Sequence, residues 1–172
     1  MNTSSSPQGI DPRGPRFGAG ITSVALLVTV GLGLSDPSAG GTLAQRAGEP
    51  AFVLLAVLSA LFAWGALAGI RKHPYGLLFS RLVKPRLAPP AFVEPPEPPT
   101  FAQLVGFLVS ITGVVLHLAG IPYGLVIASS AAFIASFLNA VFGLCLGCEL
   151  YAILIRAKII RSRSQITKGT IR

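Results

Sequence analysis

The chain has 172 residues, of which 52% are hydrophobic, and it carries a formal net charge of +8 at pH 7. In a soluble protein such a charge suggests a nucleic-acid partner. Here the basic residues do not interleave with aromatic residues, and they gather beside long apolar stretches instead. We therefore exclude nucleic acid as a partner and expect these charges to set membrane topology and to contact anionic lipid headgroups.

Four long apolar stretches dominate the chain. Each approaches or exceeds the roughly 20 residues that span a ~30 Å hydrocarbon layer, and none shows the polar stripe of a soluble core helix. We predict transmembrane helices at residues 17–34, 51–70, 101–121 and 125–155. The expected fold class is an all-α integral membrane protein, in which a four-helix domain over residues 17–155 lies between a tail of residues 1–16 and a basic tail of residues 156–172.

The first stretch admits a second interpretation. With Arg13 and Arg16 before it and the small residues Ser38, Ala39 and Gly40 after it, it also resembles a cleaved signal peptide. We favour a retained helix, because the apolar segment is longer than the ~7–15 residues usual in a signal peptide.

The basic residues lie mainly on one side of these stretches. Only Arg46 lies between the first two, and the turn of residues 120–124 has none. The other Lys and Arg residues precede the first stretch, follow the second or follow the fourth: Arg13, Arg16, Arg71, Lys72, Arg81, Lys84, Arg86, Arg156, Lys158, Arg161, Arg163, Lys168 and Arg172. By the positive-inside rule, we expect both termini and the loop of residues 71–100 to face the cytoplasm.

That loop has two parts with different patterns. Residues 75–84 separate apolar from basic side chains at helical spacing, which predicts a short amphipathic helix in the membrane interface. Seven prolines between residues 85 and 99 then predict a stiff, extended strap. We interpret the strap as a spacer that leads to the third helix, with docking of a partner module as the alternative.

Cys145 and Cys148 are the only cysteines, and Glu149 follows them directly. Two thiols three residues apart on a helix lie close enough for a disulfide, so the pair could cycle between dithiol and disulfide or pass on a persulfide. Glu149 is expected to accept the proton of the attacking thiol, a role that suits a carboxyl group whose proton affinity is raised by burial. The candidate catalytic residues are therefore Cys145, Cys148 and Glu149.

Two other roles for the cysteines stay open. Two thiolates suit a soft metal ion such as Cu(I), so in an alternative interpretation Cys145 and Cys148 are the metal ligands of a soft-metal binding or transport component. The pair could also simply pack as small apolar residues in a structural membrane subunit. In the predicted helix over residues 125–155 the cysteines lie near the C-terminal end, where the helix dipole opposes thiolate formation. The chain has no Walker loop, nucleotide fingerprint or catalytic triad, and the sequence assigns it no cofactor.

Three segments, residues 11–20, 73–76 and 137–151, resemble a bacterial multi-pass membrane family that is catalogued only as a domain of unknown function. Its end motif is matched at Asn139, Cys145, Gly147, Cys148 and Glu149. The resemblance implies an integral protein of the bacterial inner membrane, and some relatives resemble components of thiol or sulfur-handling systems.

We therefore expect a thiol redox or sulfur-relay protein that works through the Cys-x-x-Cys pair at the cytoplasmic side of the membrane. Its expected partners are the lipid bilayer and a soluble thioredoxin-like or sulfurtransferase protein. Small residues in the predicted helices favour close helix packing, which is compatible with a homodimer without requiring one. Asn139 is expected to form a hydrogen bond between helices.

Overall fold

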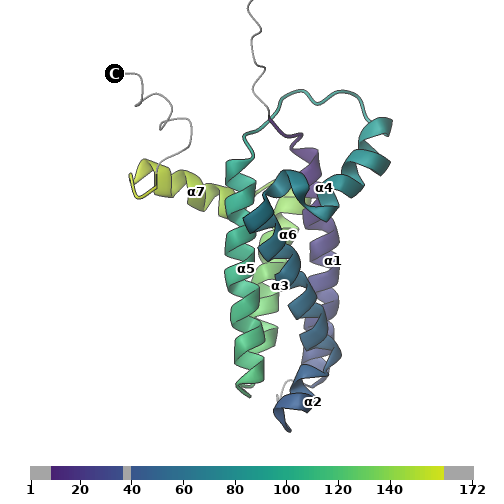
Figure 1. The fold of residues 1–172 in the computed structure, drawn as a ribbon, viewed down its shortest axis with the longest axis vertical. Coiled ribbons are helices and arrows are strands. Elements are labelled where there is room, and N and C mark those ends of the chain that lie inside the picture. Colours follow the sequence, from purple (N-terminus) through teal and green to yellow (C-terminus); the bar gives the residue numbers. More distant parts are fainter. Residues whose placement is uncertain (1–8, 37–39, 161–172) are drawn as a thin grey trace, which may run out of the picture.

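The computed structural model describes residues 9–36 and 40–160. Four long helices stand side by side in it as a bundle (Figure 1): α1 (Arg13–Ser35), α3 (Pro50–Ala68), α5 (Glu97–Leu118) and α6 (Gly124–Phe142). Each is long and apolar enough to cross a membrane. The predicted all-α membrane fold with four transmembrane helices is confirmed, and the described residues contain no strand.

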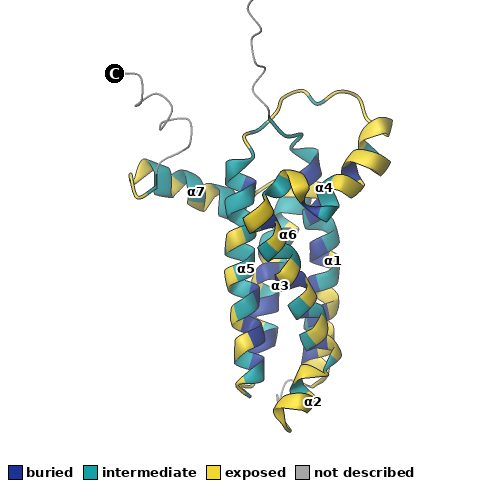
Figure 2. Ribbon diagram, viewed as in Figure 1, coloured by how far each residue is buried: buried dark blue, intermediate teal, exposed yellow. Residues whose placement is uncertain are grey.

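The bundle is held together by an apolar interior. Helix α1 packs mainly on α6, α3 packs mainly on α5, and α5 also contacts α6. The buried residues of the interior come from all four helices: Leu26, Ala51, Leu55, Leu58, Val114, Leu125 and Ala132. The outward faces carry exposed apolar side chains. Figure 2 shows the exposed residues as yellow segments along the bundle. Such an apolar outer surface suits contact with lipid.

Several buried hydroxyl groups in the bundle bond to carbonyls of their own helices, whereas Ser59 Oγ on α3 has no partner among the described residues. Thr29 Oγ1 donates a hydrogen bond to the carbonyl of Ala25 at 2.9 Å, and Ser129 Oγ donates to that of Leu125 at 2.8 Å. These bonds matter because lipid offers no water to a polar group. Close packing relies on Gly113, where an added Cβ would lie 2.6 Å from the Cβ of Ala128 on α6.

A shorter and a longer connection join α1 to α3 and α3 to α5, respectively. The first contains α2 (Leu43–Ala47), capped by Thr42 and Gln45. The second contains the 3₁₀ turn η1 (Ile70–Lys72), then α4 (Pro74–Leu78), which continues through the π-helical turn η2 (Phe79–Val83) into the 3₁₀ turn η3 (Lys84–Arg86). Phe79 is buried and contacts the ring of Phe17, with centroids 5.8 Å apart, whereas Arg81 and Lys84 are exposed. This separation of faces agrees with the predicted amphipathic segment.

The prediction of one continuous helix over residues 125–155 is wrong. Helix α6 ends at Phe142, and a separate helix, α7 (Leu146–Arg156), runs across the bundle axis (Figure 1). Gly143 breaks the helix by taking the left-handed conformation, with φ 70°, while its N–H donates to the carbonyl of Asn139 at 3.0 Å. The transmembrane part of the chain therefore ends thirteen residues earlier than we expected.

Arg16 stabilises this break from the other end of the sequence. Its Nη2 atom donates to the carbonyls of Ala140 and Val141 at 3.4 and 3.2 Å. These are carbonyls of the last turn of α6, which have no partner inside the helix, and a cation at a helix C-terminus also interacts favourably with the helix dipole. Helix α1 thus fixes where α6 stops.

The helices place most positive charge at one end of the bundle, which we call the basic end. It comprises the start of α1, the α3–α5 connection, the end of α6 and α7 (Figure 1). Every Lys and Arg within residues 9–36 and 40–160 except Arg46 belongs to these segments or, in the case of Lys158, directly follows α7. The predicted tails fall largely outside the described residues, since residues 1–8 and 161–172 are not described, and α1 begins at Arg13.

Candidate functional site

The cysteine pair lies at the N-terminus of α7, just after the helix break. Cys145 is the N-cap residue, with extended backbone angles of φ −90° and ψ 95°, and its Sγ atom accepts the backbone N–H of Cys148 at 3.3 Å. The two Cα atoms are 5.2 Å apart, within the range that a disulfide requires, and the two sulfur atoms are joined as a disulfide. The sulfur atom thus takes the place of the oxygen that usually caps a helix.

This position removes the objection that the helix dipole opposes a thiolate at the cysteine pair. We expected the cysteines near a helix C-terminus, and that expectation is wrong because the break at Gly143 starts a new helix with Cys145. At a helix N-terminus the free N–H groups and the positive end of the dipole favour a thiolate. The pair therefore lies at a helix N-terminus, as is usual for a redox Cys-x-x-Cys unit, and not at a helix C-terminus.

Close packing fixes the first turn of α7 on α5. A Cβ added to Gly147 would lie 2.6 Å from both the Cα and the Cβ of Ala102, so only a glycine fits between the two cysteines. Farther along α7, the ring of Tyr151 contacts that of Phe101, with centroids 5.5 Å apart. These contacts hold the disulfide against the start of α5.

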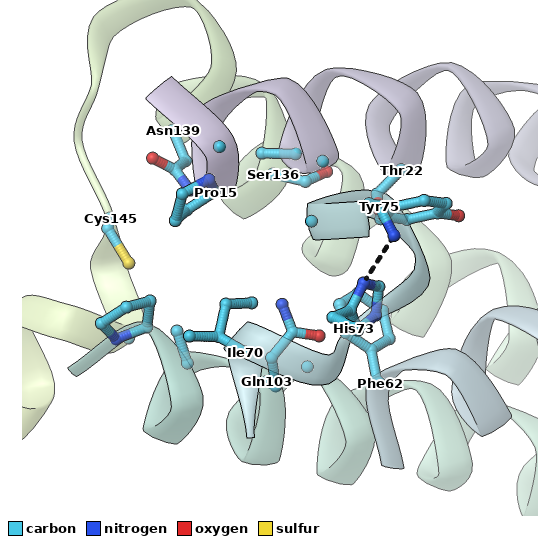
Figure 3. A pocket seen from close by; sticks show the side chains of 18 of the residues that line it. Pro15, Thr22, Phe62, Ile70, His73, Tyr75, Gln103, Ser136, Asn139 and Cys145 are labelled. Atoms are coloured by element: carbon cyan, nitrogen blue, oxygen red, sulfur yellow. Dashed lines mark hydrogen bonds between the residues drawn. The ribbon is translucent and has the colours of Figure 1, made fainter. Parts of the chain in front are cut away.

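Glu149 does not have the burial that we expected. It is exposed on the first turn of α7, where its backbone N–H donates to the carbonyl of Cys145 at 3.0 Å. The interhelical hydrogen bond expected for Asn139 is also missing, since its side chain has no hydrogen bond to the described residues. Instead Asn139 lies beside Pro15 on the wall of a cavity (Figure 3).

The cavity has a volume of about 590 Å³ and extends from the basic end into the bundle. Helices α1, α4, α5, α6 and α7 all contribute to its walls, which are mainly apolar. The sulfur of Cys145 faces it from one end, and His73 and Tyr75 stand at the other (Figure 3). Sequence reasoning missed this cavity, because its walls come from segments that share no local pattern.

His73 lies in the loop that is predicted to face the cytoplasm, on the same side as the cysteines. Both of its ring nitrogens already take part in hydrogen bonds. Nδ1 accepts the backbone N–H of Tyr75 at 3.2 Å, and this requires Nε2 to carry the proton that it shares with the carbonyl of Leu61 at 3.2 Å. Burial lowers the pKa of His73, which favours the neutral ring. Within the described part of the chain, no three His, Cys, Asp or Glu side chains group as metal ligands.

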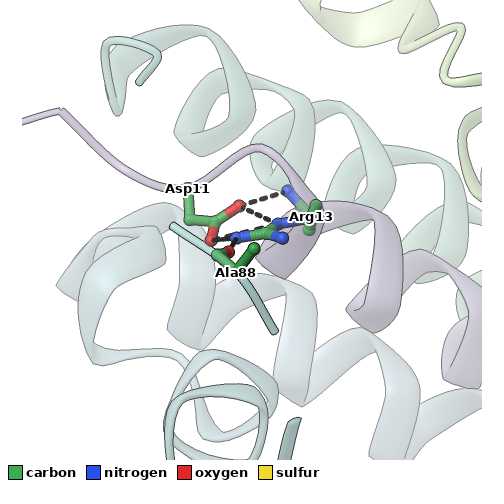
Figure 4. Close-up of polar contacts among 3 residues, drawn as sticks. All are labelled: Asp11, Arg13 and Ala88. Carbon is green, nitrogen blue, oxygen red and sulfur yellow. Dashed lines mark hydrogen bonds and ion pairs between the residues drawn. The ribbon is translucent and has the colours of Figure 1, made fainter. Parts of the chain in front are cut away.

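The predicted strap ties the N-terminal segment over the outer side of the cavity. Ile10 and Glu94 exchange two backbone hydrogen bonds, of 2.8 and 2.9 Å. Arg13 pairs with Asp11 at 2.7 Å and also donates to the carbonyl of Ala88 at 3.0 Å (Figure 4). The hydrogen bond from Arg13 lowers the pKa of Asp11, so this tether carries a charged acceptor at neutral pH.

We predict that Gly147→Ala loosens α7 from α5, because the new methyl group would overlap the backbone of Ala102. Overpacking of this kind costs about 1–3 kcal/mol. The unfolding temperature of the detergent-solubilised protein should fall, and the reduced cysteines should react faster with an alkylating reagent.

Gly20→Ala is the matched control, since a Cβ at Gly20 on α1 would meet nothing within 4 Å. It should leave both measurements unchanged or raise the unfolding temperature slightly. Equal stability of the two variants would show that α7 does not pack on α5 as described.

Comparison with curated proteins and with solved structures finds no match. A family model does match residues 10–156, a span that begins with the tethered Ile10 and ends with the last residue of α7. It therefore takes in all four transmembrane helices, the cavity walls beyond Gly9 and the cysteine pair. The chain belongs to the family described as Domain of unknown function (DUF4395).

Proposed function

We propose that this protein is a thiol redox or sulfur-relay component of a bacterial inner membrane, with the cysteine pair at the cytoplasmic face. One observation carries the proposal: Cys145 caps α7, and its sulfur accepts the N–H of Cys148 at 3.3 Å. A packing role would not need a sulfur atom at a helix N-terminus with a second sulfur within disulfide distance.

The proposed chemistry is thiol–disulfide exchange with a soluble thioredoxin-like or sulfurtransferase partner. A partner thiolate attacks Sγ of Cys148, and the S–S bond breaks with its electron pair on Sγ of Cys145. The helix N-terminus stabilises that leaving thiolate, and a stabilised thiolate leaves faster. Because the cytoplasm is reducing, the resting pair is then a dithiol and the disulfide is the oxidised end of the cycle.

The arrangement of helices supports the proposed orientation. The basic end gathers nearly all described positive charge, whereas the opposite end has Arg46 alone among the described Lys and Arg residues. Under the positive-inside rule the basic end faces the cytoplasm, with both termini on that side. Helix α7 then lies in the membrane interface and exposes Leu146, Leu150 and Ile153 toward lipid.

Reporter fusions test this orientation. Fusions after Leu43 and after Tyr123 should report the outside of the membrane, and fusions after Pro96 and after Arg172 should report the cytoplasm. The paired reporters would be alkaline phosphatase, active outside, and green fluorescent protein, fluorescent inside. A cytoplasmic result at Leu43 would invert the bundle and move the cysteines to the other compartment.

Serine substitutions test the thiol role. Cys145→Ser keeps Cys148 but removes the thiol that would release a bound partner, so mixed disulfides should accumulate. The captured protein should be soluble and of the thioredoxin-like or sulfurtransferase class, identified by mass spectrometry after purification under denaturing, non-reducing conditions. Either single substitution should also abolish the oxidised form of the pair.

The double variant Cys145→Ser, Cys148→Ser is the control and should capture nothing. Serine is close to cysteine in size, so the folding of all three variants should change little if packing is unimportant. If neither single variant captures more than the double variant, and mild oxidation forms no disulfide in the unsubstituted protein, the cysteines have a structural role.

Glu149 is proposed as the proton acceptor for the attacking thiol. Glu149→Gln keeps the shape of the side chain but cannot accept a proton, so exchange with a small soluble disulfide should slow by roughly tenfold at neutral pH. Stopped-flow or quenched alkylation measures this rate.

The direction in which the exchange rate changes separates proton transfer from a general charge effect. If Glu149 acts only as a nearby negative charge, its removal favours the thiolate and exchange becomes faster. Glu97→Gln, which removes a carboxylate from the start of α5 at the same end of the bundle, is the control for that effect.

A further inference from the structure

We infer that the cavity beside Cys145 binds a membrane quinone, which takes the electrons of the cysteine dithiol. The inference rests on the proposed thiol function and names the second substrate of the same site. A dithiol that is oxidised repeatedly needs a two-electron acceptor, and quinones are the acceptors that membranes supply for this chemistry.

The depth of the cavity is the first argument. It begins at Cys145, where α6 has ended and α7 starts, and it extends along the bundle to Val109 on α5 and Ala131 on α6. Val109 lies 12 residues after the start of α5, which is about 18 Å at 1.5 Å per residue. Since the hydrocarbon layer is ~30 Å thick, the cavity reaches its middle. The inner part of the cavity therefore lies at the depth of the lipid chains, where an apolar membrane molecule is found.

The chemistry of the walls is the second argument. The charged lining residues, Asp11, Arg71 and Lys84, all come from segments outside the helical bundle or at its outer end. The inner part is apolar apart from uncharged groups such as Gln103 and Ser136. A small-molecule thiol that carries charged groups would lose its hydration in this inner part without gaining a polar partner. An uncharged ring with two carbonyl groups would lose much less hydration. The volume of about 590 Å³ falls within the usual range of small-molecule sites.

Gln103 provides a polar group suited to both forms of a quinone. Its Oε1 atom is buried against Gly65 and has no hydrogen-bond partner among the described residues, while its amide nitrogen points into the cavity (Figure 3). An amide N–H can donate to a quinone carbonyl, and after rotation of the amide the oxygen can accept a quinol hydroxyl.

The two cysteines differ in their access to the cavity. Cys145 lines it, and Cys148 is not among its lining residues. In the proposed reaction the Cys145 thiolate forms a bond from Sγ to a ring carbon of the quinone. The Cys148 thiolate then attacks Sγ of Cys145, and the C–S bond breaks with its electron pair on the ring. The two thiol protons end on the two ring oxygens, so dithiol and quinone become disulfide and quinol.

The experiment uses the full-length protein, reduced and reconstituted in phospholipid nanodiscs. One sample receives ubiquinone-1, and another receives hydroxyethyl disulfide, which is water-soluble. Disulfide formation is followed by alkylation, and quinol formation by the loss of quinone absorbance, with one quinol expected for each disulfide. Oxidation by hydroxyethyl disulfide but not by the quinone would overturn this inference and leave the proposed function intact. Oxidation by neither would overturn both.

Two tryptophan substitutions on α5 test whether the cavity is the site. Val105 lines the cavity, whereas Leu108 is 54% exposed on the outer face of the same helix. Val105→Trp should lower the ratio of the quinone rate to the hydroxyethyl disulfide rate by at least about tenfold, because it fills the space beside the ring. Leu108→Trp should leave that ratio unchanged. Equal ratios in the two variants would show that the quinone reacts elsewhere.

Cys148→Ser isolates the first step. This variant keeps the thiolate that faces the cavity but lacks the thiol that would release the quinone. It should therefore accumulate a Cys145–quinone species, seen as a new visible absorption band that disappears in the Cys145→Ser protein. If the band appeared in Cys145→Ser instead, the quinone would be reacting with Cys148, and the proposed mechanism would be overturned.

Discussion

The end of helix α6 determines the rest of the functional region. Gly143 takes a left-handed conformation there, and Arg16 donates hydrogen bonds to the last carbonyls of the helix. Both are needed, because a break in a membrane helix leaves backbone groups without partners unless another group satisfies them. With α6 stopped, α7 can start afresh, turn across the bundle and present Cys145 at an N-terminus rather than deep within a longer helix.

Around that break, polar contacts and small residues act together. Gly147 lets α7 lie directly on α5, and the pairing of Ile10 with Glu94 brings the N-terminal segment over the outer side of the cavity. The result is an apolar space that reaches into the membrane and has one thiol at its end. In the proposed function, a thioredoxin-like partner meets the cysteine pair from the water side and the proposed quinone occupies the cavity.

Much of the architecture follows from the sequence because the bilayer allows few solutions. Four apolar stretches of suitable length had to be helices, and the distribution of basic residues grouped their ends correctly. The break at Gly143 was not predictable in the same way. Its glycine lies within an apolar run like those of the other helices, and the arginine that caps the helix end is separated from Ala140 by 124 residues. The cysteine spacing was recognised, but its position at a helix start depends on this distant contact.

The same long separation has a consequence for how the protein is made. Translation delivers α1 to the membrane first, yet its main packing partner, α6, is the last transmembrane helix to be synthesised. Until then Arg16 has no helix end to cap, and α5 has no α7 to hold. A nascent or truncated chain therefore has no thiol positioned for exchange. Under the proposed function, the site forms only after the last transmembrane helix has been made, so unfinished chains would not consume cellular thiols.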